Sequence, residues 1–218
     1  MVHTTNQQTH FILVHGACHG SWCWFKLKPL LEAAGHHVSA FDLTASGTNL
    51  QVIQQVATLA DYTMPLLDFI ATLPLDEKVV LVGHSLGGMN IALAMEKFPQ
   101  KVSVGVFLTA FMPDTDHKPS YVLDQDLELG KTLIRPSSLF MKDLRNAETF
   151  TKGGFGSVRR AYVICDEDKG IKKEFQQWMI DNNPVDEVKE LKHVDHMPML
   201  CDPKQLSVCL LDIAVQYA

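Results

Sequence analysis

The sequence predicts an α/β fold in which a mostly parallel sheet is flanked by helices on both faces. Short runs that are apolar throughout alternate along the chain with stretches whose apolar residues recur at helical spacing. Strands with two apolar faces are typical of parallel sheets that helices cover on either side. Of the 218 residues, 46% are hydrophobic and 20% are charged, which predicts one soluble globular domain over residues 1–218.

The expected strands are short runs dominated by apolar residues, and helices are expected between them. The strands are predicted at residues 11–14, 38–41, 79–82, 102–107, 161–165 and 188–191. The helices are predicted at residues 24–35, 58–73, 87–98, 173–180 and 205–217. Gly35 and Pro99 are expected to end the first and third of these helices. If Asp61 is the N-cap of the second, Pro65 falls in the first turn, where a missing N–H costs least.

Residues 112–156 differ from the rest of the chain. They hold short clusters of proline and glycine, carry more charge, and offer only modest helices around residues 127–133 and 139–144. We interpret this region as an insertion after the strand that ends at Phe107, before the alternation resumes at residue 161.

Composition excludes several classes of function. The net charge is −6 and no run of lysine and arginine stands out, so a nucleic-acid partner is not expected. No apolar stretch reaches the roughly 18 to 20 residues that span a bilayer, and residues 1–10 lack the pattern of a secretory signal. The five cysteines are scattered without zinc spacing. We therefore expect reduced thiols, no metal site, no membrane association and a cytoplasmic location.

One pentapeptide carries a specific chemical signal. Gly83-His84-Ser85-Leu86-Gly87 fits the pattern G-x-S-x-G and lies between a predicted strand and a predicted helix. That context is the one in which a serine is mounted as a nucleophile on a sharp turn, and glycines on either side leave room for the strained backbone. Ligands in parallel sheets bind at the carboxyl ends of the strands, where this serine lies.

A serine nucleophile needs a base, and in this fold class the partners follow in the order serine, acid, histidine. The base should therefore follow the last strand, where His193 and His196 lie. We favour His196, which precedes the final helix, and position alone leaves His193 as the alternative.

The acid should follow the preceding strand at residues 161–165. The candidates are Asp166, Glu167 and Asp168. We favour Asp168, because a residue a little beyond the strand end can turn toward the histidine, and Asp166 is the runner-up. Such an acid fixes the imidazole tautomer and stabilises the imidazolium.

The third requirement is an oxyanion hole. The N–H of Leu86 lies at the start of the helix after Ser85, where unpaired donors and the helix dipole favour negative charge. The second donor should come from the loop after the first strand, and we choose the N–H of Ala17. Gly16 leaves space over the site.

Several segments together resemble the family of plant methylesterases and hydroxynitrile lyases of the α/β-hydrolase fold. They are VHGACHGSW (14–22), KPLLEAAGH (28–36), GHSLGGM (83–89), FMPD (111–114), RPSSLF (135–140), EDK (167–169), EFQ (174–176) and DHM (195–197). The resemblance runs from about residue 10 to the C-terminus. It implies a triad of Ser85, His196 and Asp168, oxyanion donors at Ala17 and Leu86, and no cofactor.

Two positions separate the two chemistries of this family. Its hydroxynitrile lyases carry threonine after the first-strand histidine and lysine after the catalytic histidine, whereas this chain has Gly16 and Met197. The resemblance therefore implies a serine carboxylesterase that hydrolyses methyl esters of small acids, of the methyl salicylate, methyl jasmonate or methyl indole-acetate type, through an acyl-enzyme. Gly16, His19, Phe111 and Met197 are expected to line the substrate site.

The chain departs from the family in one region. Members carry a helical cap before the RPSSLF segment, but here residues 121–125 run almost directly into residues 126–129, so a few dozen cap residues are absent and 112–156 is a remnant. A natural short form, a splice or gene-model variant and an engineered deletion all produce such a gap. With a reduced cap, the alternative function is a small aromatic acid-binding protein with little turnover, and an exposed apolar floor favours a homodimer.

Overall fold

The computed structural model describes residues 8–125 and 138–218, and its centre is a six-stranded sheet in which every pairing is parallel. The strand order is β2-β1-β3-β4-β5-β6. The strands are β1 (His10–Val14), β2 (His37–Ala40), β3 (Val79–Ser85), β4 (Val102–Ala110), β5 (Arg159–Cys165) and β6 (Glu187–Leu191). The predicted fold class is confirmed, and each predicted strand is found within a few residues of its expected position.

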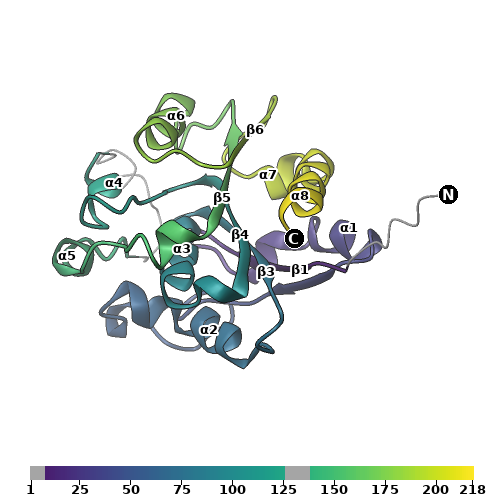
Figure 1. Cartoon of the computed structure of the whole chain (residues 1–218). Helices are drawn as coiled ribbons and strands as arrows, with labels where there is room; N and C mark the ends of the chain where they lie inside the picture. Colours follow the sequence, from purple (N-terminus) through teal and green to yellow (C-terminus); the bar gives the residue numbers. More distant parts are fainter. Residues whose placement is uncertain (1–7, 126–137) are drawn as a thin grey trace.

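Helices cover both faces of the sheet, as Figure 1 shows. The α-helices are α1 (Lys28–Ala33), α2 (Leu59–Thr72), α3 (Gly87–Lys97), α4 (Tyr121–Asp124), α5 (Met141–Asn146), α6 (Lys173–Asn182), α7 (Pro198–Cys201) and α8 (Pro203–Tyr217). Short 3-10 helices span Ser21–Trp24, Ile53–Gln55, Pro99–Lys101 and Phe155–Ser157. Helices α2, α3 and α6 contribute to one buried apolar cluster and α8 to the other. The two clusters take alternate residues of the central strands, because successive side chains of a strand point to opposite faces.

The start of α2 corrects a prediction made from the sequence. Asp61 is not the N-cap: the Oγ1 of Thr58 accepts from the N–H of Asp61, and the carboxylate of Asp61 accepts from the N–H of Thr58. This reciprocal capping box begins the helix earlier and places Pro65 inside it. Pro65 has no N–H to give the carbonyl of Asp61, and the hydroxyl of Thr44 donates to that carbonyl instead, at 2.7 Å. The proline is thus accommodated without an orphaned acceptor.

Other boundaries also differ from expectation. The first predicted helix, 24–35, is shorter than expected: a separate 3-10 helix ends at Trp24, and α1 begins at Lys28 with Pro29 in its first turn. The residue after it that turns the chain is Gly35, with φ of +95°. The modest helix predicted at 139–144 is found as α5, and the one predicted at 127–133 lies outside the described residues.

The carboxyl ends of the central strands meet at one edge of the sheet. β1, β3, β4 and β5 run side by side in the same direction, so the loops that follow them converge there. Over residues 8–125 and 138–218, no helix combines the length and apolar character needed to cross a bilayer.

Candidate active site

Ser85 ends β3 on a strained turn that only glycine neighbours allow. Its φ is +55°, a left-handed conformation that costs energy for a residue with a side chain. A Cβ on Gly83 would lie 2.6 Å from the carbonyl oxygen of Gly87, and a Cβ on Gly87 would lie 2.7 Å from that of Val14. Both glycines are therefore required by the close approach of α3 to β3 and β1.

The structure brings Ser85, His196 and Asp168 together. The Oγ of Ser85 lies 3.1 Å from Nε2 of His196, and Nδ1 of that ring lies 2.7 Å from Oδ2 of Asp168. His196 is in the loop between β6 and α7, and Asp168 is in the loop between β5 and α6. The separation of 111 residues between the serine and the histidine is closed by the parallel sheet.

The alternatives weighed for base and acid lie elsewhere. His193 is exposed and faces the exposed Glu167 at 3.2 Å. Asp166 accepts from the N–H of Val194 at 3.3 Å, so it ties two loops together and does not reach His196. The geometry therefore separates His196 and Asp168 from their neighbours.

Asp168 is held by donors on both of its oxygens. Its Oδ1 accepts from the N–H groups of Gly170 and Ile171, at 2.6 and 2.9 Å, and its Oδ2 accepts from the hydroxyl of Thr109 as well as from His196. The carboxylate side chain has no exposed surface. These donors fix the orientation of the carboxylate toward His196.

The loop that carries Asp168 is fixed by a buried glutamine that sequence reasoning missed. Gln176 of α6 is fully buried, and its Oε1 accepts from the N–H of Cys165 at 3.1 Å. Its Nε2 donates to the carbonyls of Cys165 and Ile171, at 3.2 and 2.7 Å. The side chain thus closes the loop from the end of β5 to residue 171 and sets the position of Asp168.

The two predicted oxyanion donors flank the serine. Leu86 follows Ser85 as the N-cap of α3, and Ala17 follows Gly16, whose Cα faces the serine so closely that an added Cβ would lie 2.8 Å from the Cβ of Ser85. Neither N–H donates to an acceptor within the described parts of the chain. Leu86 is thus next to Ser85 in the chain, and the residue before Ala17 packs against Ser85.

A buried histidine holds the loop of Ala17 in place. His15 is fully buried; its Nδ1–H donates to the carbonyl of Gly16 at 2.8 Å, and its Nε2 accepts from the N–H of Leu43 at 3.1 Å. Burial lowers the pKa of His15 to about 4, and the hydrogen bond with Gly16 offsets this only in part. The ring is thus neutral at pH 7, as its acceptor role toward Leu43 requires.

A carboxylate gives the same loop a second anchor. Asp42 accepts from the N–H groups of Ser21 and Thr48, at 2.6 and 2.8 Å, and also from the hydroxyl of Thr48. Burial raises the pKa of Asp42, but these hydrogen bonds outweigh it and hold the pKa at about 2. The segment that follows the first strand is therefore fixed at both of its ends.

The residues predicted to contact substrate lie around Ser85 and differ in their burial and hydrogen bonding. Gly16 packs against Ser85, and His19 donates to the carbonyl of Ala17 at 2.7 Å. Phe111 is buried; its N–H donates to the carbonyl of Ser85 at 3.1 Å, and its ring meets that of Phe175 edge to face. Met197 is half-buried at the start of α7, directly after His196. Their contact with substrate remains a prediction.

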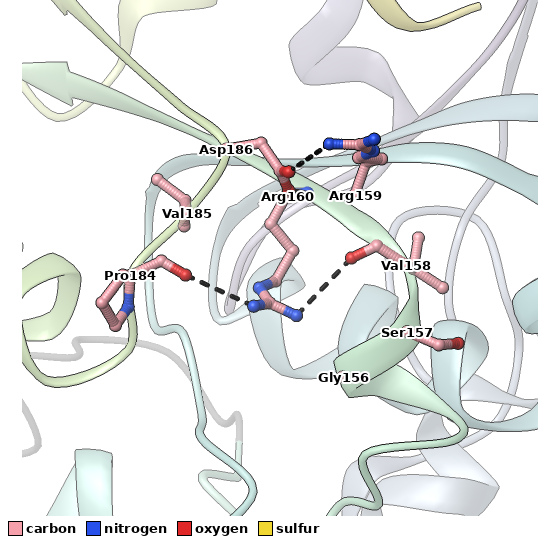
Figure 2. A pocket seen from close by; sticks show the side chains of 8 residues that line it. All are labelled: Gly156, Ser157, Val158, Arg159, Arg160, Pro184, Val185 and Asp186. Atoms are coloured by element: carbon pink, nitrogen blue, oxygen red, sulfur yellow. Dashed lines mark hydrogen bonds and ion pairs between the residues drawn. The ribbon is translucent and has the colours of Figure 1, made fainter.

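A separate hollow of about 430 Å³ lies at the opposite end of the sheet (Figure 2). It is bordered by the start of β5, where Arg159 pairs with Asp186 at 2.7 Å and Arg160 donates to the carbonyls of Val158 and Pro184. Asp168 follows the other end of β5, so this hollow is not part of the serine site.

Residues 8–125 and 138–218 contain no group of three or more histidine, cysteine or acidic side chains arranged to hold a metal. No disulfide joins any of the five cysteines, all of which lie in those ranges.

Comparison with known proteins places the chain among hydrolases. Residues 11–155 match the profile described as "Alpha/beta hydrolase family". The chain is 50% identical to salicylic acid-binding protein 2 of Nicotiana tabacum, over 95% of this chain and 98% of that protein, and 48% identical to methylesterase 1 of Arabidopsis thaliana, over 97% and 98%. The crystal structure of polyneuridine aldehyde esterase is 43% identical and superposes with a TM-score of 0.89, over 95% of this chain and 100% of that one.

The alignment with the tobacco protein also shows a difference in length. It spans 254 positions with the tobacco protein, whereas 95% of the 218 residues here is about 207. About 47 aligned positions therefore have no residue in this chain.

Proposed function

This chain belongs to the plant methylesterases of the alpha/beta hydrolase family, and we propose that Ser85, His196 and Asp168 are its catalytic triad. It is a serine esterase, and its relatives include methylesterase 1 and polyneuridine aldehyde esterase. The single observation that carries the assignment of the triad is the continuous chain of contacts from Ser85 through His196 to Asp168, at 3.1 and 2.7 Å. These distances match the reach required of a nucleophile, its base and the group that orients the base.

The geometry supports a two-step reaction through an acyl-enzyme. The Oγ of Ser85 attacks the ester carbonyl while Nε2 of His196 takes its proton. The oxyanion accepts hydrogen bonds from the N–H groups of Ala17 and Leu86, and the intermediate collapses when His196 returns the proton to the departing methanol. Water then attacks the acyl group with His196 again as base, which releases the carboxylic acid and restores Ser85.

Asp168 serves this cycle without reacting itself. Its Oδ2 accepts from Nδ1 of His196, which leaves the Nε2 lone pair directed at Ser85. When His196 becomes an imidazolium, the buried carboxylate stabilises that charge.

We propose methyl esters of small acids as substrates, of the methyl salicylate, methyl jasmonate or methyl indole-acetate type. The names of the relatives support this class: one is a salicylic acid-binding protein, and several are methylesterases. Gly16 and Met197 argue against hydroxynitrile lyase chemistry, because neither side chain can bond a cyanohydrin hydroxyl or balance the charge of cyanide.

We further propose that the residues missing relative to the tobacco protein belong to the cap over the site. The sequence runs from residues 121–125 almost directly into 126–129, where members of the family have a longer segment. A shorter roof reduces the contacts that distinguish one acyl group from another, so we expect a broad preference among small acids.

A panel of methyl esters tests the function. Purified protein is incubated with methyl salicylate, methyl jasmonate and methyl indole-acetate, and the acid released is measured by liquid chromatography against the matched variant Ser85→Ala. We expect hydrolysis of at least one ester that the variant does not catalyse. Equal rates for the two proteins with every ester contradict the proposal, and cyanide released from mandelonitrile favours the lyase.

A further inference from the structure

His84, the residue before Ser85 in the G-x-S-x-G pentapeptide, is buried and hydrogen-bonds to the main chain of His196. His84 is 1% exposed and lies one residue before Ser85 in β3. Its Nε2 lies 2.7 Å from the carbonyl oxygen of His196. A carbonyl oxygen only accepts, so Nε2 carries the proton. Within the described chain, this is the hydrogen bond that holds the main chain of His196 itself.

The other ring nitrogen of His84 has a different environment. Nδ1 is buried and has no hydrogen-bond partner among the described residues. It faces Gly16, where an added Cβ would lie 3.1 Å from it. One edge of the ring therefore holds the loop of the base, and the other edge packs against the loop that carries the oxyanion donor Ala17.

The surroundings of His84 keep its ring neutral. The ring contacts those of His196, His19 and Trp24, with centroids 4.8, 6.4 and 6.4 Å away. Burial lowers the pKa of His84 well below its usual value, and the nearby charge that His196 acquires lowers it further. A neutral donor can anchor the carbonyl of His196 without repelling the imidazolium that forms on the same residue during the reaction.

We propose that His84 is a positioning residue for the esterase reaction. Its single imidazole fixes the distance between the loop that carries His196 and the loop at Gly16 that carries the oxyanion donor Ala17. This inference rests on the proposed function. His84 touches neither the ester nor the hydroxyl proton; it acts by holding the backbone from which the base projects. Loss of that hydrogen bond lets His196 turn away from Ser85, and a displacement near 1 Å at a reacting group costs roughly 100-fold in rate.

Two substitutions separate the hydrogen bond from the volume of the ring. His84→Phe keeps an aromatic ring but loses the N–H, and we expect kcat on p-nitrophenyl acetate to fall about 10- to 100-fold while KM changes little. His84→Gln places an amide N–H at nearly the same reach as Nε2, and we expect it to recover at least part of that loss. Val82→Ala removes buried volume from the same strand and the same face, and serves as the packing control.

Thermal unfolding first establishes that every variant is folded, so that a change in kcat can be assigned to the active site. A kcat for His84→Phe within twofold of wild type overturns the proposal. A kcat for His84→Gln no higher than that of His84→Phe also overturns it, as does an equal loss in Val82→Ala.

Two readouts keep this test separate from the substrate question. The first readout is the rate at which a fluorophosphonate labels Ser85, which depends on His196 as base but requires no ester. This measurement therefore applies even if the wild-type protein hydrolyses none of the methyl esters tested. In 15N-histidine-labelled wild type, we expect NMR to show His84 as the neutral Nε2–H tautomer at pH 6.5, where an ordinary histidine is about half protonated. The Nδ1–H tautomer, or titration of His84 near pH 6.5, contradicts the proposal.

Discussion

The hydroxyl of Thr109 donates to the same oxygen of Asp168 that accepts from Nδ1 of His196. Thr109 owes this orientation to a bulge in β4, because His84 pairs with Leu108 and Ser85 pairs with Ala110, leaving Thr109 between them with φ of +35°. Bulges beside active sites re-aim side chains in this way. The strand that neighbours β3 and Ser85 thus also supports Asp168.

Replacing Thr109 by valine removes that donor at nearly constant volume. A hydrogen bond to a charged group contributes about 1.5–3 kcal/mol, so we expect a loss of that order in the free energy of unfolding at pH 7. The fall in kcat should be smaller than for loss of the carboxylate, since Gly170 and Ile171 still donate to Asp168. Urea unfolding and ester kinetics measure both effects. Thr109→Ser keeps the hydroxyl, and equal losses in the two variants contradict this role.

Neutralising Asp168 tests its assignment over the runner-up. In Asp168→Asn the amide cannot hold the productive tautomer of His196, and we expect kcat to fall roughly 10³- to 10⁴-fold. Asp166→Asn changes a carboxylate that accepts from the N–H of Val194, and its kcat should stay within a few-fold of wild type. Steady-state kinetics on one activated ester compares them, and a larger loss in Asp166→Asn reverses the assignment.

In this structure Gly16 has no room for a side chain beside Ser85. In Gly16→Ala the new Cβ lies 2.8 Å from the Cβ of Ser85 and 3.1 Å from Nδ1 of His84, so the oxyanion loop must shift. We predict a fall in kcat of about 10- to 100-fold. Gly153→Ala is the matched control, because nothing lies within 4 Å of its added Cβ. An unchanged kcat in Gly16→Ala shows that the loop does not depend on this contact.

The buried histidines predict how stability depends on pH. The folded-state pKa of His15 is about 4, below the value near 6.5 of the unfolded chain. Between these values the unfolded chain binds more protons, so stability is lost as pH falls from about 7 toward 4, by about 3 kcal/mol for this residue. His84 acts in the same direction. Urea unfolding at several pH values should show a smaller loss in His15→Gln than in wild type, and equal losses contradict the account.

The alternation of strands and helices was sufficient to predict the fold from the sequence. The serine site could be located because G-x-S-x-G falls where a strand meets a helix, and because parallel strands deliver their following loops to one edge. The choice of Asp168 over Asp166 depended on how far each residue lies beyond the strand. In the structure, Asp168 lies 2.7 Å from Nδ1 of His196, whereas Asp166 accepts from the N–H of Val194 at 3.3 Å.

The features that sequence reasoning missed depend on tertiary structure. The bulge at Thr109 is a matter of register between β3 and β4, which no local pattern reveals. His15 and His84 were part of recognised motifs, but their burial and their bonds to Leu43 and His196 come from loops distant in the chain. The start of α2 did have a local signal, because threonine followed three residues later by an acid at Asp61 forms a capping box.

The most direct test of the account traps the acyl-enzyme. The protein is mixed with p-nitrophenyl acetate, quenched in acid within the first turnover, digested, and analysed by peptide mass spectrometry. We predict an acetyl group on Ser85 in wild type, no acetylation of that peptide in Ser85→Ala, and strongly slowed acetylation in His196→Ala. Acetylation confined to another residue, or a rate at Ser85 that is the same without His196, would contradict a nucleophile activated by that histidine.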